Sequence, residues 1–252
     1  MCFSATASFT AAAALVPLAP IALRRCGRKG REDLLPLAVL PLAFSMQQAL
    51  EGVVWLGLER GPLDAAPRLA ALAYLFFAFA FWPVWIPFLA SRIDRRSQGI
   101  ETGPSRAADQ PAGRRSSTLL LLQGLGLLLA LVLWLPLAVQ PQRLEPVLLE
   151  GSIDYGTTLL LDGGLLAYGR YLYAAVIGLP LLMLPSVRLR GFGIALLASG
   201  LGADWFYRQT FASVWCYFSA VLSVLIVWII WAESAEDQAA SESVPAASSR
   251  PG

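Results

Sequence analysis

The sequence predicts an all-α fold, a polytopic membrane helix bundle of about seven transmembrane helices. Hydrophobic residues make up 57% of the 252-residue chain, and charged residues make up only 14%, where a soluble domain has roughly 25%. The mean hydropathy is +0.61. The few charges gather in short segments between long uncharged runs, as is typical of chains that cross a bilayer repeatedly.

The uncharged apolar runs define one membrane domain, residues 1–233. The predicted spans are about residues 5–23, 34–58, 69–91, 118–140, 171–187, 191–207 and 210–232. Most are long enough to cross a hydrocarbon core about 30 Å thick. The fifth and sixth, of about 17 residues each, are at the short limit, so five spans with a re-entrant hairpin are the alternative.

Most of the 19 Lys and Arg residues fall in alternate loops. These loops hold Arg24, Arg25, Arg28, Lys29 and Arg31, then Arg92, Arg95, Arg96, Arg106, Arg114 and Arg115, then Arg188 and Arg190. Short basic loops stay in the cytoplasm. The N-terminus is therefore expected outside and the C-terminus in the cytoplasm.

Three segments between or after the spans have distinct compositions. Residues 92–117 mix Arg, Ser, Gly and Pro without an apolar period, which predicts a flexible basic cytoplasmic loop. Residues 234–252 have the composition of a disordered tail. In the outer loop, residues 141–168, apolar stretches at 147–150 and 157–161 flank a Gly-containing turn. This pattern fits a short hairpin lid or a loop lying on the lipid headgroups.

The second span contains the most informative polar residues of the chain. Gln48 precedes Glu51 by three residues, Gln47 precedes it by four, and Trp55 follows it by four, so all four share one helical face. Glu51 is expected in the outer half of the bilayer. An ionisable group buried there indicates a functional site, although a protonated or Arg-paired carboxyl that braces the helices is an equal alternative.

Further polar residues are expected at the same depth. Ser4 and Ser8 lie one turn apart at the outer end of the first span, and Asp204 and Arg208 form an i, i+4 pair at the outer end of the sixth. Arg170 is an alternative partner for Glu51 or Asp204. Together these residues predict a ligand-binding cluster open to the outside, although Asp204 and Arg208 also fit a self-contained interfacial ion pair.

Four tryptophans, Trp82, Trp85, Trp228 and Trp231, mostly fit an interfacial aromatic belt or helix packing. Cys2 and Cys216 both map to the outer, oxidising side, where a disulfide, two free thiols or a nucleophilic Cys2 are possible.

The composition also limits the chemistry that the chain can support. Histidine is absent, which removes the commonest general base and the usual haem and zinc ligands. We therefore expect no cofactor and no metal. The small net charge of +2 gives no reason to expect a nucleic-acid partner. The expected partners are the lipid bilayer and a small apolar or lipid ligand, while the oligomeric state stays open.

Three sequence blocks resemble an uncharacterised family of bacterial multi-pass membrane proteins. They are Met1–Phe9 (MCFSATASF), Gln47-Gln48-x-x-Glu51-Gly52-x-x-Trp55, and Ser213–Ala220 (SVWCYFSA). The resemblance implies a protein of the bacterial inner (plasma) membrane. It implies no activity, because none is assigned to that family.

Three functions remain as hypotheses. The first is a non-enzymatic binding or sensing protein with a polar pocket in the outer half of the bundle. The second is a proton-coupled small-molecule transporter that uses Glu51, although paired repeats with matching broken helices are not evident. The third is an intramembrane lipid-modifying enzyme, for which few candidate catalytic groups are available.

The distribution of basic residues makes the topology testable with reporter fusions. Fusions after residues 30, 105 and 240 should register as cytoplasmic, and fusions after 62 and 150 as external. A fusion after residue 189 tests the two short spans most sharply, since an external signal there would exclude the seven-span arrangement.

Overall fold

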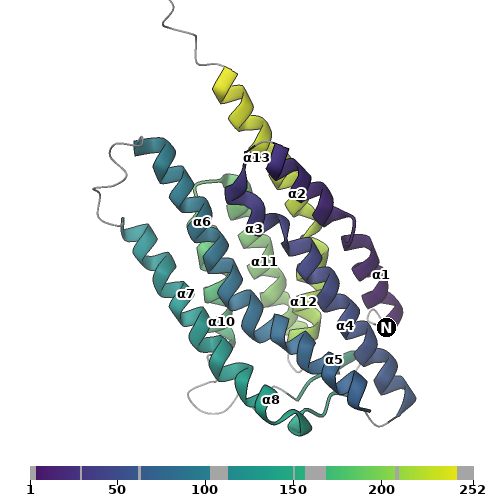
Figure 1. Ribbon diagram of the computed structural model, residues 1–252. Coiled ribbons are helices and arrows are strands. Elements are labelled where there is room, and N and C mark those ends of the chain that lie inside the picture. Colours follow the sequence, from purple (N-terminus) through teal and green to yellow (C-terminus); the bar gives the residue numbers. More distant parts are fainter. Residues whose placement is uncertain are drawn as a thin grey trace, which may run out of the picture.

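The structure is a computed structural model that describes residues 4–28, 30–61, 64–102, 113–149, 151–156, 169–207 and 210–242. Within these residues the chain forms seven helical segments packed side by side in one bundle (Figure 1). The segments are α1 (Ala5–Leu15) with α2 (Leu18–Arg28); η1 (Glu32–Leu34), α3 (Leu35–Ala38) and α4 (Leu40–Arg60); α5 (Ala65–Phe76), the π-helical η2 (Phe77–Phe81) and α6 (Trp82–Thr102); α7 (Arg114–Leu133) with α8 (Leu135–Val139); α10 (Gly169–Leu182); α11 (Val187–Phe206); and α12 (Phe211–Leu222) with α13 (Val224–Glu242).

Five helices in the described residues are long and apolar enough to cross a membrane. They are Ala5–Arg28, Glu32–Arg60, Ala65–Gln98, Arg114–Val139 and Ser213–Ala235. Helix α10 is a shorter apolar helix, and the 20-residue α11 carries Arg188, Arg190 and Asp204. The predicted all-α bundle class is therefore confirmed, while the number of spans and their orientation stay predictions.

Prolines explain where the helical segments are interrupted. Helix α1 ends at Leu15, two residues before Pro17, and α4 and α8 begin with Pro41 and Pro136 in their first turns. Proline has no N–H to donate and its ring clashes with the preceding turn, so a helix tends to end before it and a new one to begin with it.

Two of the predicted irregular segments are partly helical, so those predictions were wrong at their edges. Helix α6 continues through residues 92–102 and α7 begins at Arg114, which leaves only 103–112 of the predicted loop outside the described residues. Helix α13 likewise continues to Glu242. The low apolar content of these helix ends indicates where a membrane span stops. The helix itself can continue beyond the span where its polar side chains are hydrated or bonded to other side chains.

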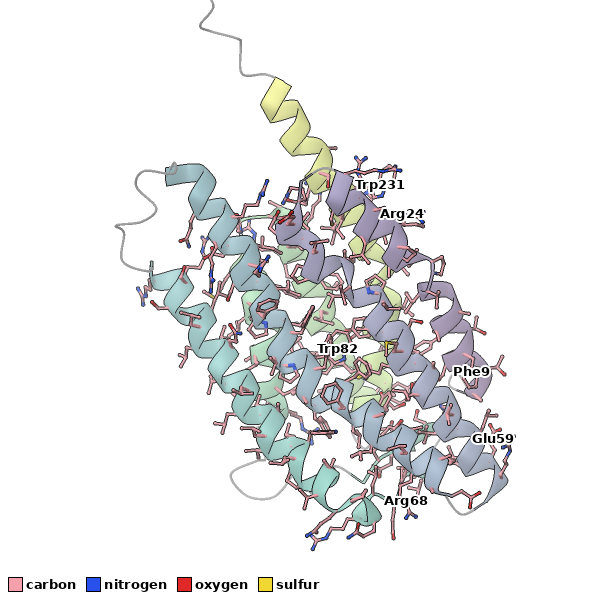
Figure 2. The ribbon with its side chains drawn as sticks, in the orientation of Figure 1. Phe9, Arg24, Glu59, Arg68, Trp82 and Trp231 are labelled. Carbon is pink, nitrogen blue, oxygen red and sulfur yellow. The ribbon has the colours of Figure 1, made fainter. Side chains whose placement is uncertain are left out.

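The basic segments predicted to be cytoplasmic meet at one end of the bundle. Arg31 forms a 2.9 Å ion pair with Asp33, and Arg96 approaches the same carboxylate at 3.3 Å. Arg31 also donates to the backbone carbonyl of Glu233, whose carboxylate pairs with Arg188 at 3.3 Å. Figure 2 shows Arg24 and Trp231 at this end, opposite Glu59 and Arg68. Side-chain bonds thus hold four segments together here.

The opposite end carries a short β-hairpin. Strands β1 (Val147–Leu149) and β2 (Ser152–Asp154) pair antiparallel, with Leu148 opposite Ile153. Gly151 makes the turn with a φ of 81°, a conformation that suits glycine. A hairpin therefore forms within residues 141–168, but its second strand occupies residues that the sequence pattern assigned to the turn. The apolar stretch predicted at 157–161 belongs to residues 157–168, which lie outside the described residues.

Helices α6 and α7 pack closely because α7 has a glycine at the contact. A Cβ atom added at Gly126 would lie 1.9 Å from the backbone oxygen of Pro83, whereas one added at Gly124 would meet nothing within 4 Å. Small residues at such crossings allow helix backbones to approach each other in a membrane.

Gly126→Ala should therefore destabilise the protein, because the new methyl group forces α7 away from α6. We expect the free energy of unfolding to fall by about 1–3 kcal/mol, measured as a lower Tm in detergent. Gly124→Ala is the matched control and should be neutral or slightly stabilising, since alanine favours the helix. Equal Tm values for the two variants would contradict this account of the contact.

Candidate functional site

The Glu51 carboxyl group lies at the centre of a buried polar cluster. Glu51 comes from α4 and is 1% exposed. The Ser213 hydroxyl, from α12, donates a 2.5 Å hydrogen bond to Glu51 Oε1. Ser8 from α1, Gln48 from α4 and Tyr74 from α5 also lie beside the carboxyl. Four helices therefore converge on one ionisable group, which gives it the polar neighbours that burial requires.

Gln47 connects this carboxyl group to the centre of the bundle. Its Nε2 donates to Cys216 Sγ at 3.1 Å, and its Oε1 accepts a 2.8 Å hydrogen bond from Trp82 Nε1. The Trp82 ring also stacks on Phe44, with 4.0 Å between ring centroids. The two bonds fix the Gln47 amide with its oxygen toward α6 and its nitrogen toward α12. We call Ser8, Gln47, Gln48, Glu51, Tyr74, Tyr155, Ser213 and Cys216 the Glu51 cluster.

The π-helical turn η2 immediately precedes Trp82 in the chain. A π-helical turn changes the direction of the side chains that follow and is frequent at functional sites. The Tyr173 hydroxyl, from α10, donates to the backbone oxygen of Ala78 within this turn. The turn is therefore bonded to a neighbouring helix, and it is followed at once by the tryptophan that contacts Gln47.

The β-hairpin covers the Glu51 cluster at the end of the bundle opposite the basic segments. The Tyr155 ring stacks on Tyr74 at a centroid distance of 4.8 Å. Ser152, Ile153 and Tyr155 are at most 2% exposed. Burial, with smaller contributions from nearby Glu51 and Cys216, raises the pKa of Tyr155 well above its usual value, so this residue presents a neutral hydroxyl. The hairpin packs as a lid over these buried residues, which is one of the two arrangements that the sequence allowed, and the orientation of the cluster toward the outside stays a prediction.

Several buried polar atoms at this end have no hydrogen-bond partner among the described residues. They are both amide atoms of Gln48, Trp55 Nε1, Ser152 Oγ and Tyr155 Oη. Each of these residues is at least nine-tenths buried. A buried polar group left unpaired costs about 1–3 kcal/mol, so such groups are rare in native proteins. These atoms lie in the half of the bundle that holds the Glu51 cluster and its lid.

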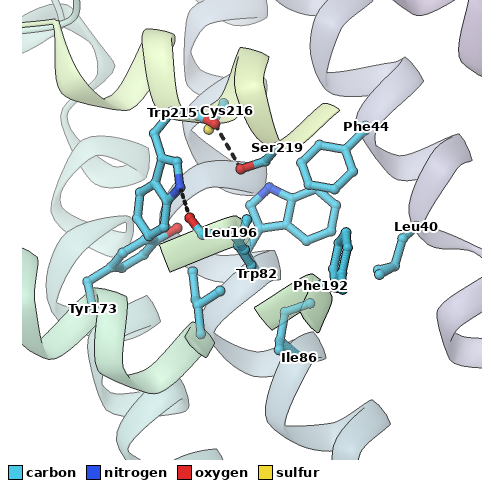
Figure 3. A pocket seen from close by; sticks show the side chains of 11 residues that line it. Leu40, Phe44, Trp82, Ile86, Tyr173, Phe192, Leu196, Trp215, Cys216 and Ser219 are labelled. Atoms are coloured by element: carbon cyan, nitrogen blue, oxygen red, sulfur yellow. Dashed lines mark hydrogen bonds between the residues drawn. The ribbon is translucent and has the colours of Figure 1, made fainter. Parts of the chain in front are cut away.

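A narrow apolar cavity adjoins the cluster at Cys216. Its volume is about 30 Å³, and Figure 3 shows Phe44, Trp82, Tyr173 and Trp215 around it. Cys216 contributes to the wall of this cavity and to that of a second, of about 20 Å³. A groove of about 150 Å³ between α10 and α11 follows, lined by exposed Tyr171 and Leu201. The second cavity shares lining residues with both the first cavity and the groove, so the three spaces are neighbours in the bundle.

The structure places the remaining predicted site residues in different roles. Arg170 forms its ion pair with Asp204, one of the two partners that the sequence allowed, and the pair lines the groove. Arg208 lies outside the described residues. Ser4 caps α1 by accepting from the backbone N–H of Ala7 at 3.2 Å, whereas Ser8 reaches the cluster.

Cys216 carries a free thiol in the structure, as does the buried Cys26. Cys2, its predicted disulfide partner, lies outside the described residues. Free thiols were among the possibilities that the sequence left open. Within the described part of the chain, no group of three or more Cys, Asp or Glu side chains could hold a metal ion.

Sequence reasoning did not assign Trp82, Tyr74, Tyr155 or Ser213 to the site. Trp82 was grouped with an interfacial belt, but it is 4% exposed and central. Its position in the middle of a predicted span, away from either end, was the signal that could have separated it from belt tryptophans. The other three depend on contacts between distant segments, which spacing within one helix does not reveal.

Residues 1–99 match the model of a family of unknown function (DUF6629). The resemblance to an uncharacterised family is thereby confirmed over this part of the chain. The match includes two of the three blocks that carried the resemblance, together with Ser8, Gln47, Gln48, Glu51 and Tyr74. No curated protein and no solved structure matches the chain.

The bond from Trp82 to Gln47 should contribute measurably to stability. Trp82→Phe keeps an aromatic ring in the core but leaves Gln47 Oε1 without its donor. We expect the free energy of unfolding to fall by about 1–3 kcal/mol, measured by thermal unfolding in detergent. Trp205→Phe, at a side chain that is 84% exposed, is the control and should leave Tm nearly unchanged. Similar Tm values for both variants would show that the bond contributes little.

Proposed function

We propose that this protein is a non-enzymatic binding protein of the bacterial inner membrane, with its N-terminus outside. Its ligand is a small amphiphilic molecule that places a polar group at the Glu51 cluster and an apolar part in the adjoining cavity. The observation that carries this proposal is the set of buried, unpartnered polar atoms on Gln48, Trp55, Ser152 and Tyr155 in the half of the bundle that holds Glu51.

The unpartnered atoms define the chemistry of the polar group. Trp55 Nε1 offers a donor, Gln48 offers both a donor and an acceptor, and the Tyr155 hydroxyl offers either. Glu51 contributes a carboxyl group whose Oε1 is already bonded to Ser213. A ligand with both donors and acceptors, such as a hydroxyl, amine or amide compound, would satisfy this arrangement.

The cavity walls define the rest of the ligand. The central cavity is lined by aliphatic and aromatic side chains from α4, α6, α10, α11 and α12. Its volume of about 30 Å³ compares with about 10–15 Å³ for a single water. A slender apolar group fits such a space, whereas a second charged group would be desolvated there without a partner.

Binding agrees better than catalysis with the way the reactive groups are held. The Gln47 amide donates to Cys216 Sγ, whereas activation of a thiol as a nucleophile requires a base that accepts its proton. Glu51 accepts from Ser213, and the lid covers both residues. These contacts hold the groups in place, as pre-organised binding sites require.

Glu51→Gln tests the proposal directly. The amide has the same shape and keeps an oxygen acceptor, but it cannot carry the charge of a carboxylate. We expect the variant to fold with a similar Tm and to lose most of the co-purified small molecule, detected by native mass spectrometry and by solvent extraction. The expected reduction is tenfold or more, about the 1.5–3 kcal/mol of a charge-assisted hydrogen bond.

Glu59→Gln is the matched control, because Glu59 lies on the same helix but is exposed. It should retain as much ligand as the unaltered protein. Full retention by Glu51→Gln across the pH range would instead mean that Glu51 only braces the bundle. A protein that yields no bound molecule under any extraction condition would overturn the binding function as a whole.

A further inference from the structure

A second cleft lies at the basic end of the bundle, between the last part of α6 and the first part of α7. Its volume is about 300 Å³, far more than the roughly 10–15 Å³ that one water needs. It is lined by Ser91, Asp94, Arg95, Gln98, Ser116, Leu119 and Leu120. The Glu51 cluster contributes no residue to this cleft.

Asp94 organises the cleft and is itself fully bonded. Its side chain is 1% exposed and accepts from Gln98 at 2.6 Å, Ser116 at 3.2 Å and Arg115 at 3.3 Å. The Arg115 charge compensates that of the carboxylate. Asp94 therefore fixes the polar side chains of both helices without leaving a free negative charge in the cleft.

Arg95 supplies the positive charge of the cleft. Its side chain lines the cleft, is exposed, and forms no ion pair with the described residues. Arg92 and Arg114 are also exposed nearby on the same two helices. A guanidinium group binds phosphate oxygens through paired hydrogen bonds. The cleft thus combines an available cation with fixed hydroxyl and amide groups.

The apolar side of the cleft indicates which kind of phosphate it fits. Leu119 is buried, but Leu120 at the cleft edge is 51% exposed, and Leu127, Leu128 and Leu131 continue an exposed apolar surface along α7. In a bilayer this surface meets acyl chains. A soluble phosphate would use the cations alone, whereas a phospholipid would use the cations and the leucine surface together.

We propose that this cleft binds the headgroup of an anionic phospholipid, with its phosphate at Arg95 and one acyl chain along Leu120 and the face of α7. Basic pockets between helices near a membrane surface recognise such headgroups by charge and by apolar contact. This site is independent of the ligand proposed for the Glu51 cluster.

The test uses the full chain in nanodiscs made from equal parts of phosphatidylglycerol and phosphatidylcholine. After mild extraction, native mass spectrometry should show phosphatidylglycerol enriched on the protein. Arg95→Gln should lower that enrichment about fivefold, the effect of one basic side chain near an anionic surface. Arg143→Gln, an exposed arginine at the opposite end, is the matched control and should leave the enrichment unchanged.

Two further measurements separate this proposal from its alternatives. Leu120→Ser should also reduce phosphatidylglycerol retention, because it removes apolar surface while leaving every charge in place. Inorganic phosphate at millimolar concentration should not displace the lipid. Equal retention of the two lipids by the unaltered protein, an unchanged enrichment in Arg95→Gln with an unaltered Tm, or displacement by phosphate would each overturn the proposal.

Discussion

The burial of one carboxyl group, that of Glu51, is the constraint on which much of the bundle depends. An ionisable group in an apolar interior must find polar partners, or the fold loses several kcal/mol. Ser8, Tyr74 and Ser213 provide them from three other helices. These partners are distant in sequence, so their contacts with the carboxyl group specify which helices are neighbours. The packing of apolar side chains is non-directional and does not provide this specificity alone.

The two ends of the bundle are held together by different interactions. At the basic end, Asp33 and Glu233 pair with arginines from other segments, and several of these side chains remain partly exposed. At the other end, the burial of Ile153 and the stacking of Tyr155 on Tyr74 hold a hairpin with strands of three residues over the Glu51 cluster. A two-stranded hairpin is marginally stable alone. Under the proposed binding function, we therefore expect a ligand to enter by movement of the hairpin more readily than through the basic end.

Much of the fold follows from the sequence because hydropathy and helical spacing are local signals. Uncharged runs located every helical segment, and the spacing of Gln47, Gln48, Glu51 and Trp55 placed them correctly on one buried face. The partners of these residues could not be predicted in the same way. Trp82 reaches Gln47 from 35 positions away, and Ser213 reaches Glu51 from 162 away. The sequence predicted that the third span ends at residue 91, but the helix continues past Asp94. The bonds of Asp94 to Arg115 and Ser116 compensate for the low apolar content of this segment.

Gln47 connects the two parts of the proposed binding site, which are the Glu51 cluster and the central apolar cavity. Its amide is bonded on one side to Trp82, which lines the central cavity, and on the other to Cys216, which lies beside Glu51 and also lines that cavity. An apolar group that displaces the Trp82 ring therefore changes the orientation of an amide within the Glu51 cluster. Under the proposed binding function, a ligand that displaces this ring leaves Gln47 Oε1 without its donor, so we expect occupancy of the cavity and of the cluster to be energetically coupled. Such coupling would favour a single molecule that contacts both the cavity and the cluster over two separate small molecules, in agreement with the amphiphilic ligand that we propose.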